Sequence, residues 1–304
     1  MIINSRFAVV LIVVGLALGG CAAQPAASDG RIVAVGAENQ YTSVIAQIGG
    51  RYVDATSVMS NPNTDPHTFE ASARVASTIS SASLVVQNGL GYDSFMTKIE
   101  AAAPSSSRIV ISAQKVLELP DSTRNPHLWY SPTTMPAVAK SITTALGKLD
   151  PAHRAYFAKN LADFNQSMTK WTDAITTFKS AHPGVAVATT EPVADYLLEA
   201  AGAKNLTPWA LQAAIMNDTD PAPQDVAIQD ALFTGGRVKV FLYNQQVTDS
   251  ITVRYLALAR AHHVPVVGVY ETMPTDGLTY QSWMLAELAA LDRAVTSHQS
   301  TVKL

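Results

Sequence analysis

Short runs rich in β-branched residues alternate with helical stretches in this sequence, and the alternation starts again after residue 183. The runs cover residues 31–37, 52–60, 83–89 and 108–113, and then residues 184–190, 238–244 and 264–270. Strands that alternate with helices are typical of parallel sheets with crossover helices. We therefore predict an α/β fold with two lobes, residues 31–149 and 183–304, each with a mostly parallel sheet flanked by helices.

One long, rigid helix is predicted to join the lobes, over residues 150–182. It begins at Asp150-Pro151, because proline is favoured in the first turn of a helix. Its apolar side chains recur at alternating steps of four and three and form one seam, namely Phe157, Leu161, Phe164, Met168, Trp171, Ile175 and Phe178. Some thirty residues would make a rod about 45 Å long, so we predict limited closure of the lobes on a ligand. A coiled-coil dimer is the alternative for such a seam, whereas we expect a monomer.

Residues 1–21 are predicted to be a lipoprotein signal peptide. Arg6 precedes an apolar run, residues 7–18, which has the length of a signal peptide and is too short to span a bilayer comfortably. The run leads into Leu-Gly-Gly-Cys21, which resembles the bacterial lipobox. We therefore predict lipidation of Cys21, a flexible tether over residues 22–30, and a protein anchored on the outer face of a bacterial cell membrane. An ordinary secretory signal with an incidental cysteine is the alternative.

Charge and cysteine content narrow the possible functions. After residues 1–21 the chain carries 20 basic and 24 acidic residues, and the basic ones are scattered without interleaved aromatics. This pattern indicates no nucleic-acid partner. Because Cys21 is the single cysteine, the chain has no disulfide framework, and any metal site must use histidine, aspartate and glutamate.

Two short motifs place a histidine directly after a proline and two residues before an aromatic side chain. They are Asp-Pro-His-Thr-Phe at residues 65–69 and Asn-Pro-His-Leu-Trp at residues 125–129. Each follows a predicted strand, and ligands of α/β proteins bind in loops at the carboxyl ends of strands. Proline restricts the backbone around each histidine, so less freedom is lost when the ring is held in place. A single loop histidine is usually a surface residue, but the matched pair predicts that His67 and His127 are metal ligands.

Two glutamates follow predicted strands of the C-terminal lobe in the same way. Glu191 follows the run that ends at residue 190, and Glu271 follows the run that ends at residue 270. Glu191 alone could be a first-turn carboxylate favoured by its helix dipole. Two imidazoles and two carboxylates, however, would offset the charge of a divalent cation. Asp276 lies in the same loop as Glu271 and is the alternative fourth ligand.

The donor set also bears on which metal would bind. Two nitrogens and two oxygens suit Zn²⁺ in tetrahedral coordination, whereas bidentate carboxylates would raise the coordination number and favour Mn²⁺. Intrinsic affinity ranks zinc above manganese in most such sites. The sequence therefore predicts a transition metal, with zinc slightly favoured over manganese.

Together these features resemble the zinc- or manganese-specific solute-binding lipoproteins of bacterial ABC transporters, a ZnuA/TroA-like family. The resemblance is carried by the lipobox, the long helix, and the segments DPHTFE, NPHLWY, TTEPVADYLLEAAG and VPVVGVYETMP. It covers essentially the whole mature chain. It implies a metal held between two lobes by one residue from each of four loops, and delivery to an ABC permease driven by its ATPase.

Carried over by position, the resemblance assigns His67, His127 and Glu191 as ligands and leaves Glu271 and Asp276 as alternatives for the fourth. Two departures concern the metal. Ser131-Pro132 stands where Asp-Pro often follows the second motif, and the loop rich in histidine and aspartate that is common in zinc-specific members is absent.

Two other functions remain as alternatives, a metal-dependent hydrolase and a surface adhesin. A hydrolase would use one glutamate as a base on metal-bound water. The sequence contains no His-Glu-x-x-His motif and no Gly-x-Ser-x-Gly motif, so we predict that the protein is not an enzyme.

Overall fold

The structure is a computed structural model that describes residues 30–61, 69, 72–247, 249–274 and 277–304. Residues 31–304 form one compact unit. The predicted signal peptide with Cys21, most of the tether, and the candidate ligands His67 and Asp276 lie outside the described residues. Within the described part of the chain, no helix is both long and apolar enough to cross a membrane.

The N-terminal lobe is built on a four-stranded parallel sheet with the order β2-β1-β3-β4. The strands are β1 (Ile32–Glu38), β2 (Val53–Met59), β3 (Leu84–Gln87) and β4 (Ile109–Ser112). The connecting helices are α1 (Asn39–Gly49), α2 (Ala73–Ser81), α3 (Ser94–Ala102), α4 (Ala113–Val116) and α5 (Thr134–Leu149), with short 3-10 helices η1 (Gly50–Tyr52) and η3 (Leu128–Tyr130). β1 is central, since Val35 lies opposite both Thr56 of β2 and Val85 of β3.

The C-terminal lobe repeats this arrangement with a sheet of order β6-β5-β7-β8. Its strands are β5 (Ala186–Thr189), β6 (Lys204–Asn205), β7 (Val240–Asn244) and β8 (Val266–Val269). Its helices are α7 (Asp195–Ala200), α8 (Trp209–Met216), α9 (Pro223–Thr234), α10 (Ser250–Ala261) and α11 (Tyr280–Ser297). The predicted α/β fold with two parallel sheets is thus confirmed. The sequence predicts three strands here, and β6, which has only two residues, is not among them.

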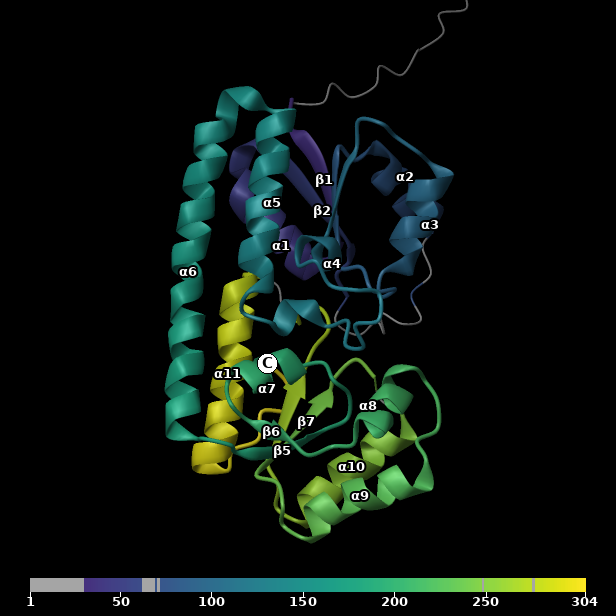
Figure 1. Cartoon of the computed structure of the whole chain (residues 1–304), viewed down its shortest axis with the longest axis vertical. Coiled ribbons are helices and arrows are strands. Elements are labelled where there is room, and N and C mark those ends of the chain that lie inside the picture. Colours follow the sequence, from purple (N-terminus) through teal and green to yellow (C-terminus); the bar gives the residue numbers. More distant parts are fainter. Residues whose placement is uncertain (1–29, 62–68, 70–71, 248, 275–276) are drawn as a thin grey trace, which may run out of the picture. The chain divides into compact units, whose positions relative to one another are not determined.

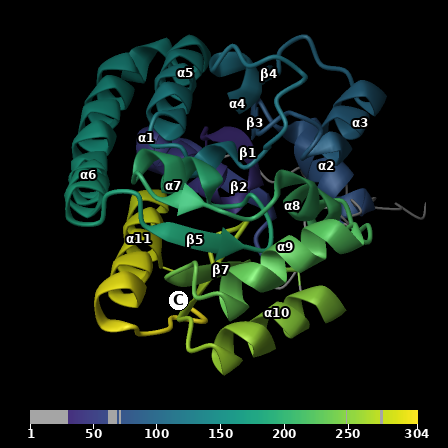
Figure 2. The ribbon, with the colours of Figure 1, turned by 60° about the horizontal axis from the view of Figure 1, so that its bottom comes forward.

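Helices cover both faces of the C-terminal sheet because alternate residues of a strand point to opposite sides. Phe241 of β7 packs with Phe233 of α9 and Tyr255 of α10. Its neighbour Leu242 belongs to the core cluster that includes α11. Figure 2 shows α9 and α10 on one side of β5 and β7, and α11 on the other.

The long helix α6 (Arg154–Ala181) follows a 3-10 turn, η4 (Pro151–His153), and passes both sheets (Figure 1). Six of the seven predicted seam residues are buried along it, and only Leu161 is half-buried. The seam packs against α1 and α5 in the N-terminal lobe and against α11 in the C-terminal lobe. Its apolar side chains therefore face this chain's own lobes, as the prediction of a connecting helix requires.

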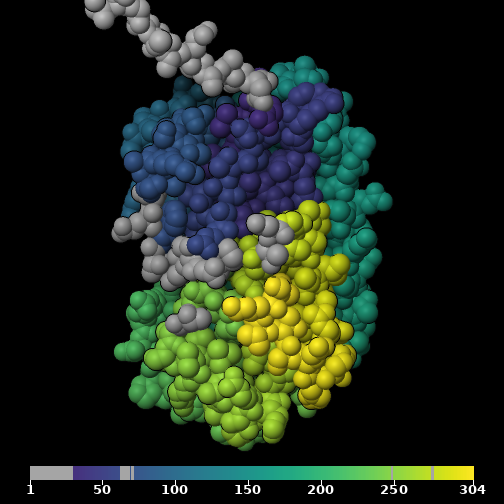
Figure 3. All heavy atoms as spheres, turned by 180° about the vertical axis from the view of Figure 1, so that it is seen from behind, coloured from purple at the N-terminus to yellow at the C-terminus, as the bar shows by residue number. Residues whose placement is uncertain are grey.

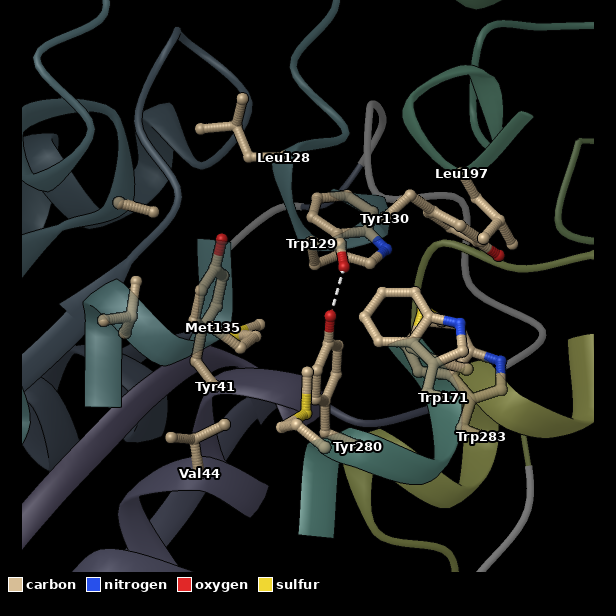
Figure 4. Close-up of a cluster of buried hydrophobic side chains, with 14 of the residues drawn as sticks. Tyr41, Val44, Leu128, Trp129, Tyr130, Met135, Trp171, Leu197, Tyr280 and Trp283 are labelled. Atoms are coloured by element: carbon tan, nitrogen blue, oxygen red, sulfur yellow. Dashed lines mark hydrogen bonds between the residues drawn. The ribbon is translucent and has the colours of Figure 1, made fainter. Parts of the chain in front are cut away.

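Aromatic side chains from both lobes and from α6 meet in one buried cluster (Figure 4). Trp171 of α6 packs edge-on against Tyr280 of α11, with 6.0 Å between ring centroids. The Tyr280 hydroxyl donates to the carbonyl of Trp129, which belongs to the second Pro-His motif, over 2.5 Å. The cluster therefore fixes the backbone two residues after His127 to the C-terminal lobe.

The start of α11 also contacts the N-terminal lobe directly. Gln281 donates to Gln47 of α1 and to Ser167 of α6, and the Tyr280 N–H donates to Ser43. Figure 3 shows the yellow-green residues of α11 against the violet N-terminal elements on this face. Limited closure of the lobes stays a prediction, and these contacts are the ones that closure or opening would have to alter.

Candidate metal centre

The candidate ligands of the C-terminal lobe lie at one edge of its sheet. Glu191 follows β5 by two residues, Glu271 follows β8 by two residues, and β7 between these strands ends at Asn244. Parallel strands bring their carboxyl ends to the same edge, so the three side chains are neighbours in space. All three are almost completely buried.

His127, from the N-terminal lobe, lies at this same edge of the C-terminal sheet. It directly precedes η3, and its Nε2 lies 3.4 Å from Oε2 of Glu271, with both side chains fully buried. The two residues are 144 positions apart in the sequence. The structure thus brings together one predicted ligand from each lobe, a nitrogen and an oxygen donor that face each other.

Asn125 orients the His127 ring. The Asn125 Nδ2 donates to the carbonyl of Pro192 over 2.8 Å, which directs Oδ1 towards the histidine. That oxygen accepts the His127 backbone N–H at 3.0 Å and lies 2.8 Å from Nδ1. Nδ1 therefore carries the hydrogen, and Nε2 is the nitrogen directed towards Glu271. Metal-binding histidines are typically held in this way, with the other ring nitrogen donating to an oxygen.

Asn244 joins the two carboxylates. Its Nδ2 donates to Oε1 of Glu191 over 3.0 Å and to Oε1 of Glu271 over 2.6 Å. Glu191 and Glu271 are therefore linked by hydrogen bonds to the same amide group. Asn244 was not predicted to belong to the site, although its position at the end of the predicted run 238–244 was a signal that could have marked it.

Glu271 is also held by both lobes. The hydroxyl of Tyr92, in the N-terminal lobe, donates to Oε2 over 2.8 Å, and the Gln40 side chain donates to the backbone carbonyl over 3.0 Å. The Glu271 N–H donates to Gln246 over 2.7 Å. Burial and the neighbouring Glu271 carboxylate raise the pKa of Tyr92 well above its ordinary value, so its hydroxyl keeps its hydrogen and remains a donor.

Glu38, at the end of β1, is a third acid of this region that sequence reasoning missed. It is fully buried, and neither carboxylate oxygen has a hydrogen-bond partner in the described part of the chain. Burial, followed by the charges of Asp93 and Glu271, raises its pKa well above the ordinary range. The neutral form is therefore favoured, which keeps a further negative charge away from the site.

The described residues supply part of the predicted ligand set. His127 faces Glu271, and Glu191 is joined to Glu271 only through Asn244, whereas His67 and Asp276 lie outside the described residues. Over the described ranges, no three side chains of histidine, cysteine, aspartate or glutamate are grouped as a metal site would require. The ligand set, and the choice between Glu271 and Asp276, stay predictions.

Comparison with known proteins gives a match to a family described as ZnuA, zinc-uptake complex component A, periplasmic, over residues 35–294. The manganese-binding lipoprotein MntA of Bacillus subtilis (strain 168) is 26% identical over 166 residues, which are 51% of this chain and 54% of MntA. The high-affinity zinc uptake system protein ZnuA of the same organism is 22% identical over 249 residues, which are 75% of this chain and 76% of that protein. The chain spans about half the length of the first curated relatives that it matches.

The fold also matches solved structures. The solute-binding protein (SBP) FpvC of Pseudomonas aeruginosa, solved in complex with Ni²⁺, superposes with a TM-score of 0.72 at 21% identity. The superposition covers 90% of this chain and 100% of that chain. At this identity the likeness establishes the fold alone.

Proposed function

Because the chain belongs to the ZnuA family, the periplasmic component A of zinc-uptake complexes, we propose that it captures a divalent transition metal outside the cytoplasm for a membrane permease. The permease would be that of an ABC transporter driven by its ATPase. Members of this family are solute-binding proteins, so the prediction that the chain is not an enzyme is confirmed at the level of the family. Anchoring through a lipid on Cys21 is part of the proposal, and the similarity to the lipoprotein MntA supports it.

The observation that carries the proposal is the approach of His127 to Glu271 across the two lobes. An imidazole nitrogen and a carboxylate oxygen lie 3.4 Å apart in a fully buried position, with Glu191 joined to Glu271 through Asn244. We propose that His67, His127, Glu191 and Glu271 are the ligands, with Asp276 as the alternative to Glu271. The hydrogen bonds that hold Glu271 from Tyr92, Gln40 and Gln246 support Glu271 as the fourth ligand.

Zinc is the favoured cargo, with manganese as the alternative. Two nitrogens and two oxygens form the tetrahedral set that zinc prefers, and zinc binds most sites of this kind more tightly than manganese. Relatives point to both ions, since ZnuA of Bacillus subtilis is a zinc uptake protein and MntA binds manganese. The chemistry of the donors therefore decides the preference.

A calorimetric titration of metal-free residues 25–304 with Zn²⁺ and with Mn²⁺ tests this function. We expect binding of one ion per chain, tighter for zinc than for manganese. In the same titration, Glu271→Ala and Asp276→Ala separate the two candidates for the fourth ligand, because only the true ligand should abolish tight binding. If neither ion binds the unmodified protein, the proposed function is wrong and the family resemblance is one of fold.

The role proposed for Asn125 gives a further prediction. Asn125→Ala removes the acceptor for Nδ1 of His127, and loss of a group that orients a metal ligand typically lowers affinity about 10- to 100-fold. Asn125→Asp keeps that acceptor, loses the bond to Pro192 and adds a negative charge, and a carboxylate is a usual partner for the second nitrogen of a metal-binding histidine. We therefore expect the aspartate variant to bind zinc much more tightly than the alanine variant in a competition titration. Equal losses in both variants would mean that the bond to Pro192, and not the orientation of the ring, is what matters.

A further inference from the structure

We propose that Asn244 is a positioning residue that makes the two carboxylates of the site bind metal through one oxygen each, and so favours zinc over manganese. The inference rests on the proposed function, because it takes Glu191 and Glu271 as ligands. It goes further by assigning the metal preference to a side chain that is not itself a ligand.

The orientation of the Asn244 amide is fixed by its neighbours. The backbone N–H of Gln246 donates to Oδ1 over 3.0 Å, so Nδ2 must point the other way, towards the carboxylates. An amide nitrogen has two hydrogens, and here one goes to Glu191 and the other to Glu271. The Asn244 N–H also donates to the hydroxyl of Thr190, the residue before Glu191, over 3.0 Å. The side chain is fully buried, so water cannot replace these partners.

Each carboxylate therefore uses its Oε1 oxygen to accept a hydrogen bond from the same amide. Bidentate binding of a metal would draw that oxygen away and leave a buried amide hydrogen without its acceptor, which is costly in a protein interior. Coordination through the other oxygen leaves both amide hydrogens with their acceptors. At Glu271 that oxygen also accepts from the Tyr92 hydroxyl, but a hydroxyl hydrogen can rotate, whereas the amide hydrogens are fixed. Asn244 thus favours one metal–oxygen bond from each of Glu191 and Glu271.

The number of metal–oxygen bonds decides which ion fits. Two carboxylates that bind through one oxygen each, with two imidazoles, give the four ligands of a tetrahedral zinc site. Manganese prefers six oxygen-rich ligands in octahedral geometry, which bidentate carboxylates would help to supply. Removing the two donors of Asn244 should therefore release the carboxylates and move the preference towards manganese.

Asn244→Leu tests the proposal, because leucine has the same branched arrangement of side-chain heavy atoms and no donor. Zinc and manganese affinities would be measured by competition with a chromophoric chelator, and the coordination number from the visible d–d bands of Co²⁺, which are intense for four ligands and weak for six. We expect an intense spectrum for the unmodified protein, a clearly weaker one for the variant, and a zinc-to-manganese affinity ratio lowered about 10- to 100-fold. Asn160→Leu is the matched control, since Asn160 is a partly buried amide of α6 that donates to the carbonyl of Ile48 in α1.

The outcomes distinguish this inference from the proposed function. If the unmodified protein binds neither zinc nor manganese, the proposed function fails. If it binds zinc while Asn244→Leu keeps the same affinity ratio and cobalt spectrum, Asn244 has no such role. Asn244→Ala also lacks the amide donors and adds no bulk, so it allows the same measurement if the leucine variant does not fold.

Discussion

Replacing His127 with alanine is expected to lower the zinc affinity more than 100-fold. Loss of a residue that only orients a metal ligand already lowers metal affinity about 10- to 100-fold, and His127 would supply a metal–nitrogen bond itself. The ring is fully buried, with Nε2 held 3.4 Å from Glu271 and Nδ1 held by Asn125, so no other side chain can take its place without rearrangement. Competition titration of the metal-free protein against a chelator of known affinity measures the loss.

A control substitution at another histidine shows whether the loss of zinc affinity is specific to the site. His262 is an exposed histidine at the C-terminus of α10, and His262→Ala should leave the zinc affinity unchanged. Circular dichroism of both variants checks that the fold is intact, and His127→Gln, which keeps much of the side-chain volume, serves if the alanine variant is unstable. Tight binding by a folded His127 variant would show that the site is misassigned.

The second large effect is expected for Glu287→Gln, which should change how the free energy of unfolding depends on pH. Glu287 of α11 is buried, and its Oε1 accepts from the indole of Trp283 over 3.0 Å and from the hydroxyl of Tyr130 over 3.2 Å. Burial raises the pKa of Glu287 from 4.5 to about 8. The same Tyr130 hydroxyl accepts the Tyr270 N–H, so Glu287 supports the loop that presents Glu271.

The sign of the effect follows from which state binds the proton. Between about pH 4.5 and pH 8 the folded protein keeps the Glu287 proton that the unfolded chain has released, so this group lowers the free energy of unfolding as the pH rises. The loss of stability begins near the unfolded pKa, is complete above the folded one, and amounts to about 5 kcal/mol at most. In Glu287→Gln the side chain cannot ionise, so this loss of stability with rising pH should disappear. Urea unfolding of both proteins at pH 5 and at about pH 9 measures this. We expect the free energy of unfolding of the variant, relative to that of the unmodified protein, to be higher at pH 9 than at pH 5.

Other groups that titrate in this range, among them Asp93, whose pKa burial raises to about 6, act equally in both proteins and cancel in the difference. Glu199→Gln, at an exposed glutamate of α7, should show no such gain. A Glu287→Gln difference that does not change with pH would mean that Glu287 is ionised in the folded protein.

Much of the fold could be predicted because its signals are local. The strands β3, β5 and β8 lie inside runs of apolar and β-branched residues, and the seam of α6 repeats with the period of a helix. β6 could not be predicted in this way, because two residues, Lys204 and Asn205, carry no periodicity. They pair with β5 only because the turn after α7 returns the chain to that edge of the sheet.

The sequence by itself determined the order of strands and helices, the two-lobed α/β architecture and the places where His127, Glu191 and Glu271 follow their strands or loops. These depend on side-chain patterns between near neighbours. Only the tertiary structure decided what those residues meet, since His127 and Glu271 are brought together by the packing of two lobes. It also decided the orientation of the amides of Asn125 and Asn244, because their partners Pro192 and Glu191 lie 67 and 53 residues away and no local pattern specifies which of many asparagines will find them.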